Sequence, residues 1–172
     1  MKIIPPVLVE VKPSKIISGE IGLFAARDIR AGTIIGSHEY IKEDFYPWSI
    51  FETLDEKTQE KVMNYCVGTE EGFYAPEDFN YLPSIWQMNH SCDGNVAFDK
   101  DDNFITIRDV IAGDELCWDY GLTETNPRFK MECHCGSSRC RKTITGNDWK
   151  FLRLQPDKAK YMSKELMEKE ND

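Results

Sequence analysis

The sequence lacks long hydrophobic runs and several other features that would assign it to a class. No apolar stretch approaches the roughly 20 residues that a membrane-spanning helix needs. The first residues, MKIIPPVLVEVKPSK, have two early prolines and no A-x-A-like cleavage site, which excludes a secretory signal. Internal repeats and low-complexity tracts are also absent. We therefore expect a soluble intracellular protein, with nuclear, cytoplasmic and host-delivered locations all open.

Positive charge is scarce. The chain has 21 Lys and Arg residues against 30 Asp and Glu residues, which gives a formal net charge of −9. Because nucleic-acid binding depends on a basic surface, we expect no direct nucleic-acid partner. An acidic surface suits a cationic protein or peptide, although many soluble proteins are acidic without having such a partner.

A regular alternation of helices and strands is missing, and so is a G-x-G-x-x-G turn, which excludes a Rossmann-type fold. Short strand-like stretches dominate instead. Residues Val7 to Val11 alternate in polarity, and the glycine-punctuated stretch 19–36 predicts a strand, a turn and a strand. Residues 95–98 and 103–110 bracket a turn-like DKDDN and predict a hairpin. The 172 residues thus predict one β-rich α+β domain.

Helices are expected in only two places. Thr53 and Glu56 form a capping box before EKTQEKVMNYC, in which Val62 and Cys66 share one face. The second helix is expected in the tail that begins at Asp157.

The tail helix follows Pro156 and has a narrow apolar stripe of Ala159, Met162 and Leu166. A docked lid, a partner-binding helix and a frayed end all fit this pattern.

The six cysteines favour a metal site over disulfides, because clustered cysteines without a secretory signal are more often metal ligands. Cys133, Cys135 and Cys140 lie within eight residues, but a structural zinc ion needs four ligands. Free thiols, or His134 in place of one cysteine, remain open on spacing alone. We expect Cys66 and Cys117 to be ordinary core residues.

Three segments together point to a family: NHSC at 89–92, GDELCWDYG at 113–121 and CHCGSSRCRKTI at 133–144. In this order they closely resemble the SET-domain protein lysine methyltransferases that carry a post-SET zinc segment. GLFAARDIRAGTIIG, at 22–36, resembles the opening strands of that family. The resemblance covers about residues 14–144 and implies a SET-domain fold of several small curved sheets with a pseudoknot.

The resemblance also implies domain boundaries. We expect an N-terminal strand extension at 1–14, a SET domain at 15–122 with an insert at about 40–82, a post-SET zinc segment at 128–145, and a partly helical C-terminal tail at 146–172.

The fourth metal ligand follows from the resemblance. It implies that Cys92 joins Cys133, Cys135 and Cys140 around one structural Zn²⁺, for which thiolates are suitable ligands. Such a closed site leaves no position for substrate. Because it ties the tail to the NHSC motif, we expect zinc loss to disorder the active site.

The implied reaction is methyl transfer from S-adenosylmethionine to a lysine ε-amine. Tyr120 matches the active-site tyrosine of the family, which would orient the amine. Asn89 and His90 match contacts to the methionine and adenine ends of the cofactor. A second cofactor strip is expected in the turn after Gly19, where the family usually has G-x-G and this chain has one residue more. The strip comprises Glu20, Ile21, Gly22 and Leu23.

The substrate channel is expected to include Trp118, Tyr74 and Trp149. Trp118 stands where the family carries Phe or Tyr, so mono-, di- and trimethylation all remain open. Trp86 and Gln87 likewise replace the Arg and Phe of a common R-F-x-N-H motif. An acidic, aromatic segment at 70–82 suits a basic peptide such as a histone tail, although a solvated acidic loop fits it equally well.

A second function class is a catalytically silent, zinc-stapled SET-like module that binds basic peptides. The presence of Tyr120, Asn89 and His90 favours the enzyme. A zinc-dependent nucleic-acid binder is disfavoured by the charge. The sequence predicts neither the target lysine nor the oligomeric state.

Overall fold

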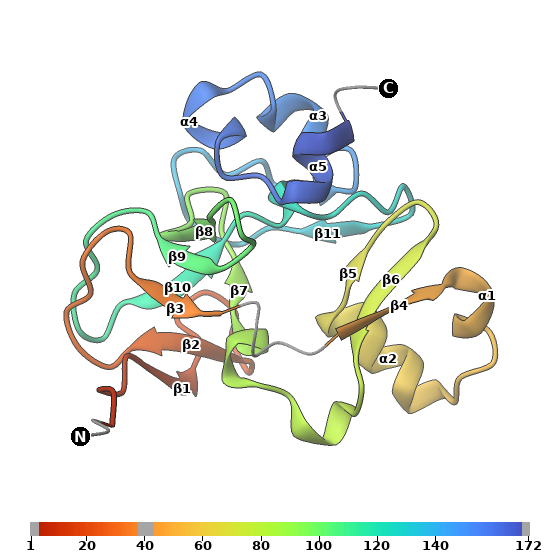
Figure 1. Cartoon of the computed structure of the whole chain (residues 1–172), viewed down its shortest axis with the longest axis horizontal. Helices are drawn as coiled ribbons and strands as arrows, with labels where there is room; N and C mark the ends of the chain where they lie inside the picture. The colour runs from red at the N-terminus through yellow and green to blue at the C-terminus, as the bar shows by residue number, and fades with distance from the viewer. Residues whose placement is uncertain (1–3, 38–42, 170–172) are drawn as a thin grey trace.

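The computed structural model describes residues 4–37 and 43–169. Its strands form three sheets, and short helices cover their ends (Figure 1). The expected starts of the N-terminal extension and of the insert, and the last three residues of the tail, lie outside the described residues. No helix in the described ranges has the length and apolar character that crossing a membrane would require.

The largest sheet has seven strands in the order β1-β2-β10-β8-β9-β3, with β7 paired to β10. Its strands are β1 (Val9–Pro13), β2 (Ile21–Ala25), β3 (Ile34–Gly36), β7 (Asn89–His90), β8 (Val96–Phe98), β9 (Phe104–Thr106) and β10 (Glu115–Trp118). Strand β7 is parallel to β10, so the NHSC segment lies directly beside the ELCW segment. This pairing brings together motifs that are more than 20 residues apart in the sequence.

The predicted hairpin at 95–110 is confirmed, because β8 and β9 are antiparallel and Phe98 pairs with Phe104. The Asp99 carboxylate caps the turn by accepting hydrogen bonds from the backbone of Asp101 and Asn103. Strands β2 and β3 also form, but they do not pair with each other. Strand β3 pairs with β9, and β2 lies between β1 and β10.

The first strand begins later than its polarity predicts. It spans Val9–Pro13, because the register with β2 starts at Val9 opposite Ala25. Val7 remains 67% exposed and lies outside the strand.

A second sheet of three strands has the order β4-β6-β5 and lies beside two helices. Its elements are β4 (Glu43–Pro47), β5 (Val67–Gly68), β6 (Gly72–Pro76), α1 (Trp48–Phe51) and α2 (Glu56–Tyr65). A separate small core of Val62, Phe73 and Ala75 holds this unit together, with Trp48 and Phe51 packed against it.

The predicted capping box at Thr53 is wrong. The Asp55 carboxylate caps helix α2 instead, accepting hydrogen bonds from the backbone of Lys57 and Thr58. The Thr53 hydroxyl is engaged elsewhere, because it donates to the carbonyl of Ile50 at the end of α1. At the other end, Cys66 is already extended and only half-buried, whereas Val62 is buried.

The remaining elements lie at the C-terminal end. Strands β11 (Lys130–Glu132) and β12 (Thr143–Thr145) form a two-stranded sheet, and three short helices follow: α3 (Asp148–Leu152), α4 (Pro156–Ala159) and α5 (Lys164–Glu168). The tail is therefore not one continuous helix. In the described part it is docked rather than frayed, because Met162 and Leu166 belong to the main core.

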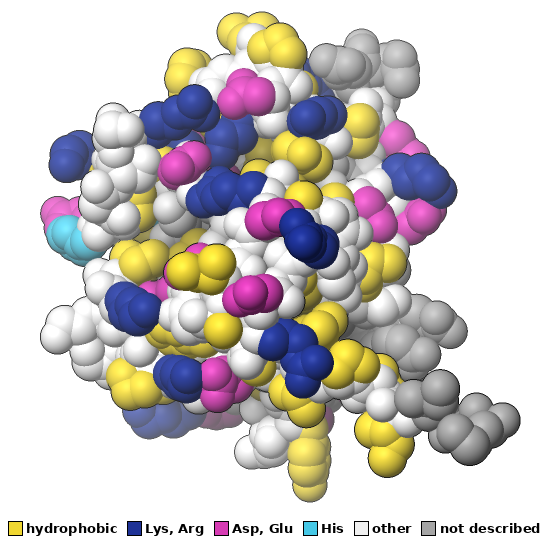
Figure 2. All heavy atoms as spheres, turned by 90° about the vertical axis from the view of Figure 1, so that its left-hand side faces the viewer, with side chains coloured by type: hydrophobic (Ala, Val, Ile, Leu, Met, Phe, Trp, Pro, Cys, Tyr) yellow, Lys and Arg dark blue, Asp and Glu magenta, His cyan; other side chains and the backbone are white. Residues whose placement is uncertain are grey.

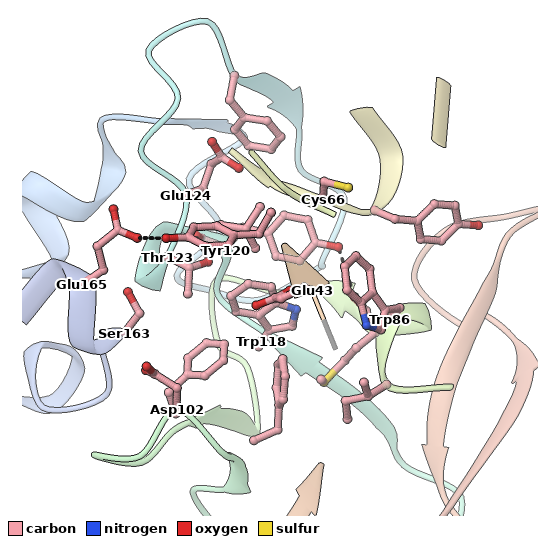
Figure 3. A pocket seen from close by; sticks show the side chains of 18 of the residues that line it. Glu43, Cys66, Trp86, Asp102, Trp118, Tyr120, Thr123, Glu124, Ser163 and Glu165 are labelled. Carbon is pink, nitrogen blue, oxygen red and sulfur yellow. Dashed lines mark hydrogen bonds between the residues drawn. The ribbon is translucent and has the colours of Figure 1, made fainter. Parts of the chain in front are cut away.

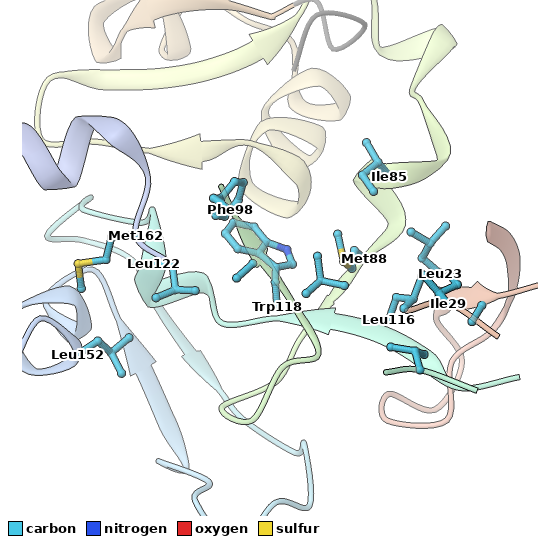
Figure 4. Packing of buried hydrophobic residues seen from close by; sticks show 14 of the residues in the cluster. Leu23, Ile29, Ile85, Met88, Phe98, Leu116, Trp118, Leu122, Leu152 and Met162 are labelled. Atoms are coloured by element: carbon cyan, nitrogen blue, oxygen red, sulfur yellow. The ribbon is translucent and has the colours of Figure 1, made fainter. Parts of the chain in front are cut away.

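The main core runs from the large sheet to the tail, as Figure 4 shows. Leu23 and Leu116 lie at one end of it, Trp118 in the middle, and Leu152 and Met162 at the other end. The described residues also include the 3-10 turns η2 (Phe79–Tyr81), η3 (Ser84–Gln87) and η4 (Tyr120–Leu122). Turn η4 starts two residues after the end of β10, and Tyr120 packs against this core.

Figure 2 shows the side of the molecule nearest β1, β3 and β9. On this face Lys and Arg side chains are interspersed with Asp and Glu, and small hydrophobic areas lie between them. One of the ion pairs in the protein joins Arg30 to Asp109 at 3.0 Å. The net negative charge of the chain is thus not gathered on this side.

Candidate active site and metal centre

Four cysteine side chains converge at one point. The Sγ atoms of Cys92, Cys133, Cys135 and Cys140 all lie within 4.8 Å of one another. Cys92 follows β7, and the other three lie in the loop between β11 and β12. In a tetrahedron with Zn–S bonds of about 2.3 Å, neighbouring sulfurs lie about 3.8 Å apart. The separation of 3.8 Å between the sulfurs of Cys92 and Cys133 fits that geometry.

The surroundings of the four cysteines also suit a metal. The backbone N–H of Arg141 donates to the Cys92 sulfur at 3.3 Å, a contact that supports a thiolate. His134 does not belong to the cluster. Its ring is 68% exposed and lies 3.7 Å from the Glu132 carboxylate, so it points away from the sulfurs.

A buried group of charges connects this loop to the large sheet. Both terminal N–H groups of the Arg141 guanidinium donate hydrogen bonds to the Asp119 carboxylate, at 2.8 and 2.6 Å. Its Nε–H donates to the Asp148 carboxylate at 2.7 Å. Lys158 Nζ donates to the carbonyl of Cys92 at 3.1 Å and lies 3.6 Å from Asp119. We call Asp119, Arg141, Asp148 and Lys158 the anchor network. Its two carboxylates are matched by two cations.

Sequence reasoning missed the anchor network. Asp119 and Arg141 lie inside the recognised segments, directly before Tyr120 and after Cys140, but their pairing across 22 residues has no local signal. Lys158 lies in the tail, and a single lysine in a charged segment gives no indication that it is buried.

Tyr120 begins turn η4, and its side chain is enclosed. Its hydroxyl donates to the carbonyl of Met88 at 3.1 Å, and burial raises its pKa well above the ordinary value. The ring lies 4.9 Å from that of Trp118 and 5.1 Å from that of His90. The phenol therefore stays protonated at neutral pH.

His90 is tied to Tyr120 through the backbone. Its Nδ1 accepts the N–H of Tyr120 at 3.2 Å, which leaves the proton of a neutral ring on Nε2, 3.4 Å from the Cys92 sulfur. Burial lowers the pKa of His90 to about 4, so the ring is neutral at pH 7. The histidine thus lies between Tyr120 and the cysteine cluster.

The predicted cofactor strip lies against Asn89. The Asn89 amide donates to the carbonyl of Ile21 at 3.0 Å and to the Glu115 carboxylate at 2.9 Å. A Cβ at Gly22 would lie 2.4 Å from Glu115 Oε1, so a larger residue there would displace this carboxylate. Glu20 and Ile21 are exposed, and Leu23 is fully buried.

Glu115 is a second residue that sequence reasoning missed. Besides Asn89, its carboxylate accepts hydrogen bonds from the Ser14 hydroxyl at 2.8 Å and the Lys15 backbone at 2.7 Å. It therefore ties the chain before β2 to β10, 100 residues away.

A cavity of about 370 Å³ opens next to Tyr120 (Figure 3). Trp118, Tyr120, Trp86 and Tyr74 all line it, so two of the three predicted channel residues reach this space. Trp118 also packs in the main core, where its ring lies 5.1 Å from that of Phe98.

Trp149, the third predicted channel residue, does not line this cavity. It lies in α3, where the guanidinium of Arg153 stacks over its ring at 4.8 Å. Cys66 lines the cavity and also packs, half-buried, against the small core of the second sheet, and Cys117 is buried as expected.

The charges around the cavity have one sign. Its lining includes no Lys, Arg or His in the part of the chain that the structure describes. We call its four acidic residues the cavity carboxylates: Glu43, Asp102, Glu124 and Glu165.

Glu124 is the buried member of this group. Its two carboxylate oxygens accept the backbone N–H groups of Gly68 and Asn126, at 2.9 and 2.8 Å. Burial nevertheless raises its pKa to about 7, from an ordinary value of 4.5.

Comparison with known proteins identifies the family. Residues 20–121 match the family described as SET domain, which is more than half of the 172 residues. The chain belongs to the SET domain family. The β-rich α+β fold and the family resemblance expected from the sequence are thereby confirmed.

The curated relatives of this SET-domain chain are much longer proteins. It is 42% identical over 62 residues to "Histone-lysine N-methyltransferase 2D" of Homo sapiens, covering 32% of this chain and 1% of that protein. It is 25% identical over 136 residues to "Histone-lysine N-methyltransferase 2B" of Homo sapiens, covering 72% and 5%. With "Histone-lysine N-methyltransferase SUVR4" of Arabidopsis thaliana it shares 28% identity over 177 aligned positions, covering 86% and 36%. The chain thus spans about a third or less of the length of each of these relatives.

Proposed function

We propose that the chain is a protein-lysine N-methyltransferase that transfers a methyl group from S-adenosylmethionine to a lysine ε-amine. The observation that carries this proposal is the position of Tyr120 in a SET-domain fold. Its phenol lies at the wall of an aromatic cavity, one residue from the anchor network and in contact with His90. Given the names of the relatives, we propose a histone or another basic protein as the substrate.

The cavity suits the nucleophile that this reaction needs. A lysine attacks only as an uncharged amine, and an aromatic, poorly hydrated environment lowers its pKa. Trp118 and Tyr120 supply such walls. The Tyr120 hydroxyl donates its proton to the carbonyl of Met88, so its oxygen is left to accept a hydrogen bond from the amine. Because its pKa is raised, the phenol orients the amine and does not remove its proton.

The cosubstrate supplies a methyl carbon that is activated by a positively charged sulfur. The new N–C bond forms as the S–C bond breaks, and water takes the proton that the amine loses. This chain aligns the amine with the methyl carbon and excludes water, which are the usual ways in which an enzyme accelerates such a displacement. We assign the methionine end of the cosubstrate to the strip of Glu20–Leu23 and Asn89, and its adenine to the side of His90.

One structural Zn²⁺ would be held by Cys92, Cys133, Cys135 and Cys140. In this arrangement it would fasten the loop between β11 and β12 to Cys92, two residues after His90 at the end of β7. We also propose the boundaries 15–122 for the SET domain and 128–145 for the post-SET segment. A histone substrate would place the activity in the nucleus.

The test is transfer of labelled methyl groups from S-adenosylmethionine to mixed histones, followed by mass spectrometry of the products. We expect Tyr120→Phe to lower kcat by roughly 100-fold or more, as loss of one preorganised polar group commonly does. Tyr81→Phe is the matched control, because Tyr81 is 83% exposed and should leave kcat unchanged. If the protein bound basic peptides but transferred no methyl group, the proposed enzyme would be rejected in favour of the catalytically silent peptide-binding module.

A further inference from the structure

The C-terminal tail supplies one wall of the cavity next to Tyr120. Ser163 and Glu165 both line it, from the start of α5. The backbone N–H of Ser163 donates to the carbonyl of Leu122 at 3.0 Å, and that of Lys164 to Asp102 at 2.9 Å. These contacts fix the wall to the turn that carries Tyr120 and to the turn between β8 and β9.

The packing of α5 makes this wall part of the folded domain. Met162 and Leu166 flank the lining residues and are 3% and 1% exposed. Glu165 lies between them in sequence but is exposed to solvent. Its carboxylate therefore lies where the cavity opens rather than at its floor.

A hydrogen bond across the opening orients this carboxylate. The Tyr74 hydroxyl, on β6 of the second sheet, donates to Glu165 Oε2 at 3.3 Å, marked by the dashed line at Glu165 in Figure 3. The two residues are 91 positions apart. Only one oxygen of Glu165 is engaged, and among the described residues its carboxylate has no cationic partner within 4.0 Å.

Two of the other cavity carboxylates, Glu124 and Asp102, are less available to a ligand. Glu124 is buried, and both of its oxygens accept backbone N–H groups. Asp102 accepts the N–H of Lys164. Glu165 thus combines an exposed position, a free oxygen and surroundings of negative charge without a lining cation.

We propose that Glu165 is a specificity-determining residue, which selects substrates with a basic residue next to the target lysine. The inference rests on the proposed function for the identity of that lysine. While the target amine is directed inward to Tyr120, the neighbouring cation remains at the opening and pairs with Glu165. Tyr74 holds the carboxylate in place.

The experiment uses two lysine peptides that differ only in carrying arginine or glutamine beside the lysine. Peptide Kd is measured by fluorescence anisotropy, and KM and kcat by methyl transfer. We expect Glu165→Gln to weaken binding of the arginine peptide roughly five- to tenfold and to leave the glutamine peptide unchanged. kcat should stay constant. The preference of the parent protein should shrink at high salt, because the site is open to solvent.

Two further variants separate charge from structure. Glu168→Gln removes a carboxylate from the same helix that lies 4.0 Å from Lys164 and does not line the cavity, so the preference should persist. Tyr74→Phe keeps the charge and removes only the hydrogen bond, so the preference should fall by less than in Glu165→Gln. Equal preference in Glu165→Gln and the parent protein would overturn the proposal. Selective binding without methyl transfer would instead support it and count against the proposed enzyme.

Discussion

The anchor network and the cavity carboxylates both lie next to Tyr120, but they differ in whether cations accompany their negative charges. In the anchor network, the buried carboxylate of Asp119 and the half-buried carboxylate of Asp148 are matched by a guanidinium and an ammonium group. The cavity has four carboxylates and no lining cation among the described residues. Charges paired within the fold serve to hold it together. A cavity lined by carboxylates and by no described cation can attract a cation from outside, so the comparison separates a structural region from a candidate binding region.

Loss of the metal should have the largest effect, because it removes the centre to which the anchor network is attached. Cys140→Ser should bind less than one zinc ion per chain and melt at a lower temperature. Structural zinc contributes on the order of 10 kcal/mol in small zinc domains, and part of this would be lost. Metal analysis and thermal unfolding are the measurements. Cys66→Ser is the control, since Cys66 lies outside the cluster. Full zinc content in Cys140→Ser would contradict the site.

Breaking the anchor network from within should come next. Arg141→Ala leaves Asp119 and Asp148 enclosed without their main cation, which commonly costs about 3–5 kcal/mol for a buried pair. Urea unfolding of the zinc-loaded protein measures this loss. Arg139→Ala breaks an exposed pair with Asp157 and should change the free energy of unfolding by less than about 1 kcal/mol. If both variants lost a similar free energy of unfolding, the anchor network would contribute no more to stability than an exposed ion pair.

The smallest effect concerns Glu124 and depends on pH. Its pKa is about 7 in the folded protein and near 4.5 when unfolded, so the folded state binds more protons between these values. The free energy of unfolding should therefore fall as pH rises from about 4.5 to 7, by about 2–3 kcal/mol, and level off above that. Glu124→Gln should remove this slope.

The comparison of unfolding curves at pH 5.5 and 8 isolates this contribution, because titration of other groups cancels between parent and variant. Glu60→Gln, an exposed carboxylate paired with Lys57, should keep the slope of the parent protein. Parallel curves for the parent protein and Glu124→Gln would show that Glu124 is ionised in both states.

Local patterns predicted local features well. The hairpin of β8 and β9 followed from alternating residues around a polar turn, and the fold class followed from many short strands. Thr53 was mistaken for a helix cap because Asp55, two residues later, offers the same chemistry and its carboxylate reaches two backbone donors. The tail has an apolar stripe, but it breaks into short helices where Met162 and Leu166 dock on the core.

The candidate site was predictable only where its residues lie in recognisable segments. The cysteines, Tyr120 and Asn89 belong to such segments. Glu165 and Lys158 do not, and their partners lie 91 and 66 residues away. Glu115 lies inside GDELCWDYG, but its contact with Lys15, 100 residues away, has no local signal. Contacts of this kind depend on how the sheets and the tail pack together, which no local spacing encodes.

The contact of Lys158 with the Cys92 carbonyl limits how this tail can be exchanged. A chimera that received residues 146–169 from a relative would inherit a new wall beside Tyr120 and, with it, new substrate preferences. We expect it to be less stable unless the donor segment also brought a cation to position 158, since Asp119 would keep only Arg141 and the Cys92 carbonyl would lose its donor. An exchange of this segment would therefore change the proposed substrate preference and the stability of the fold together.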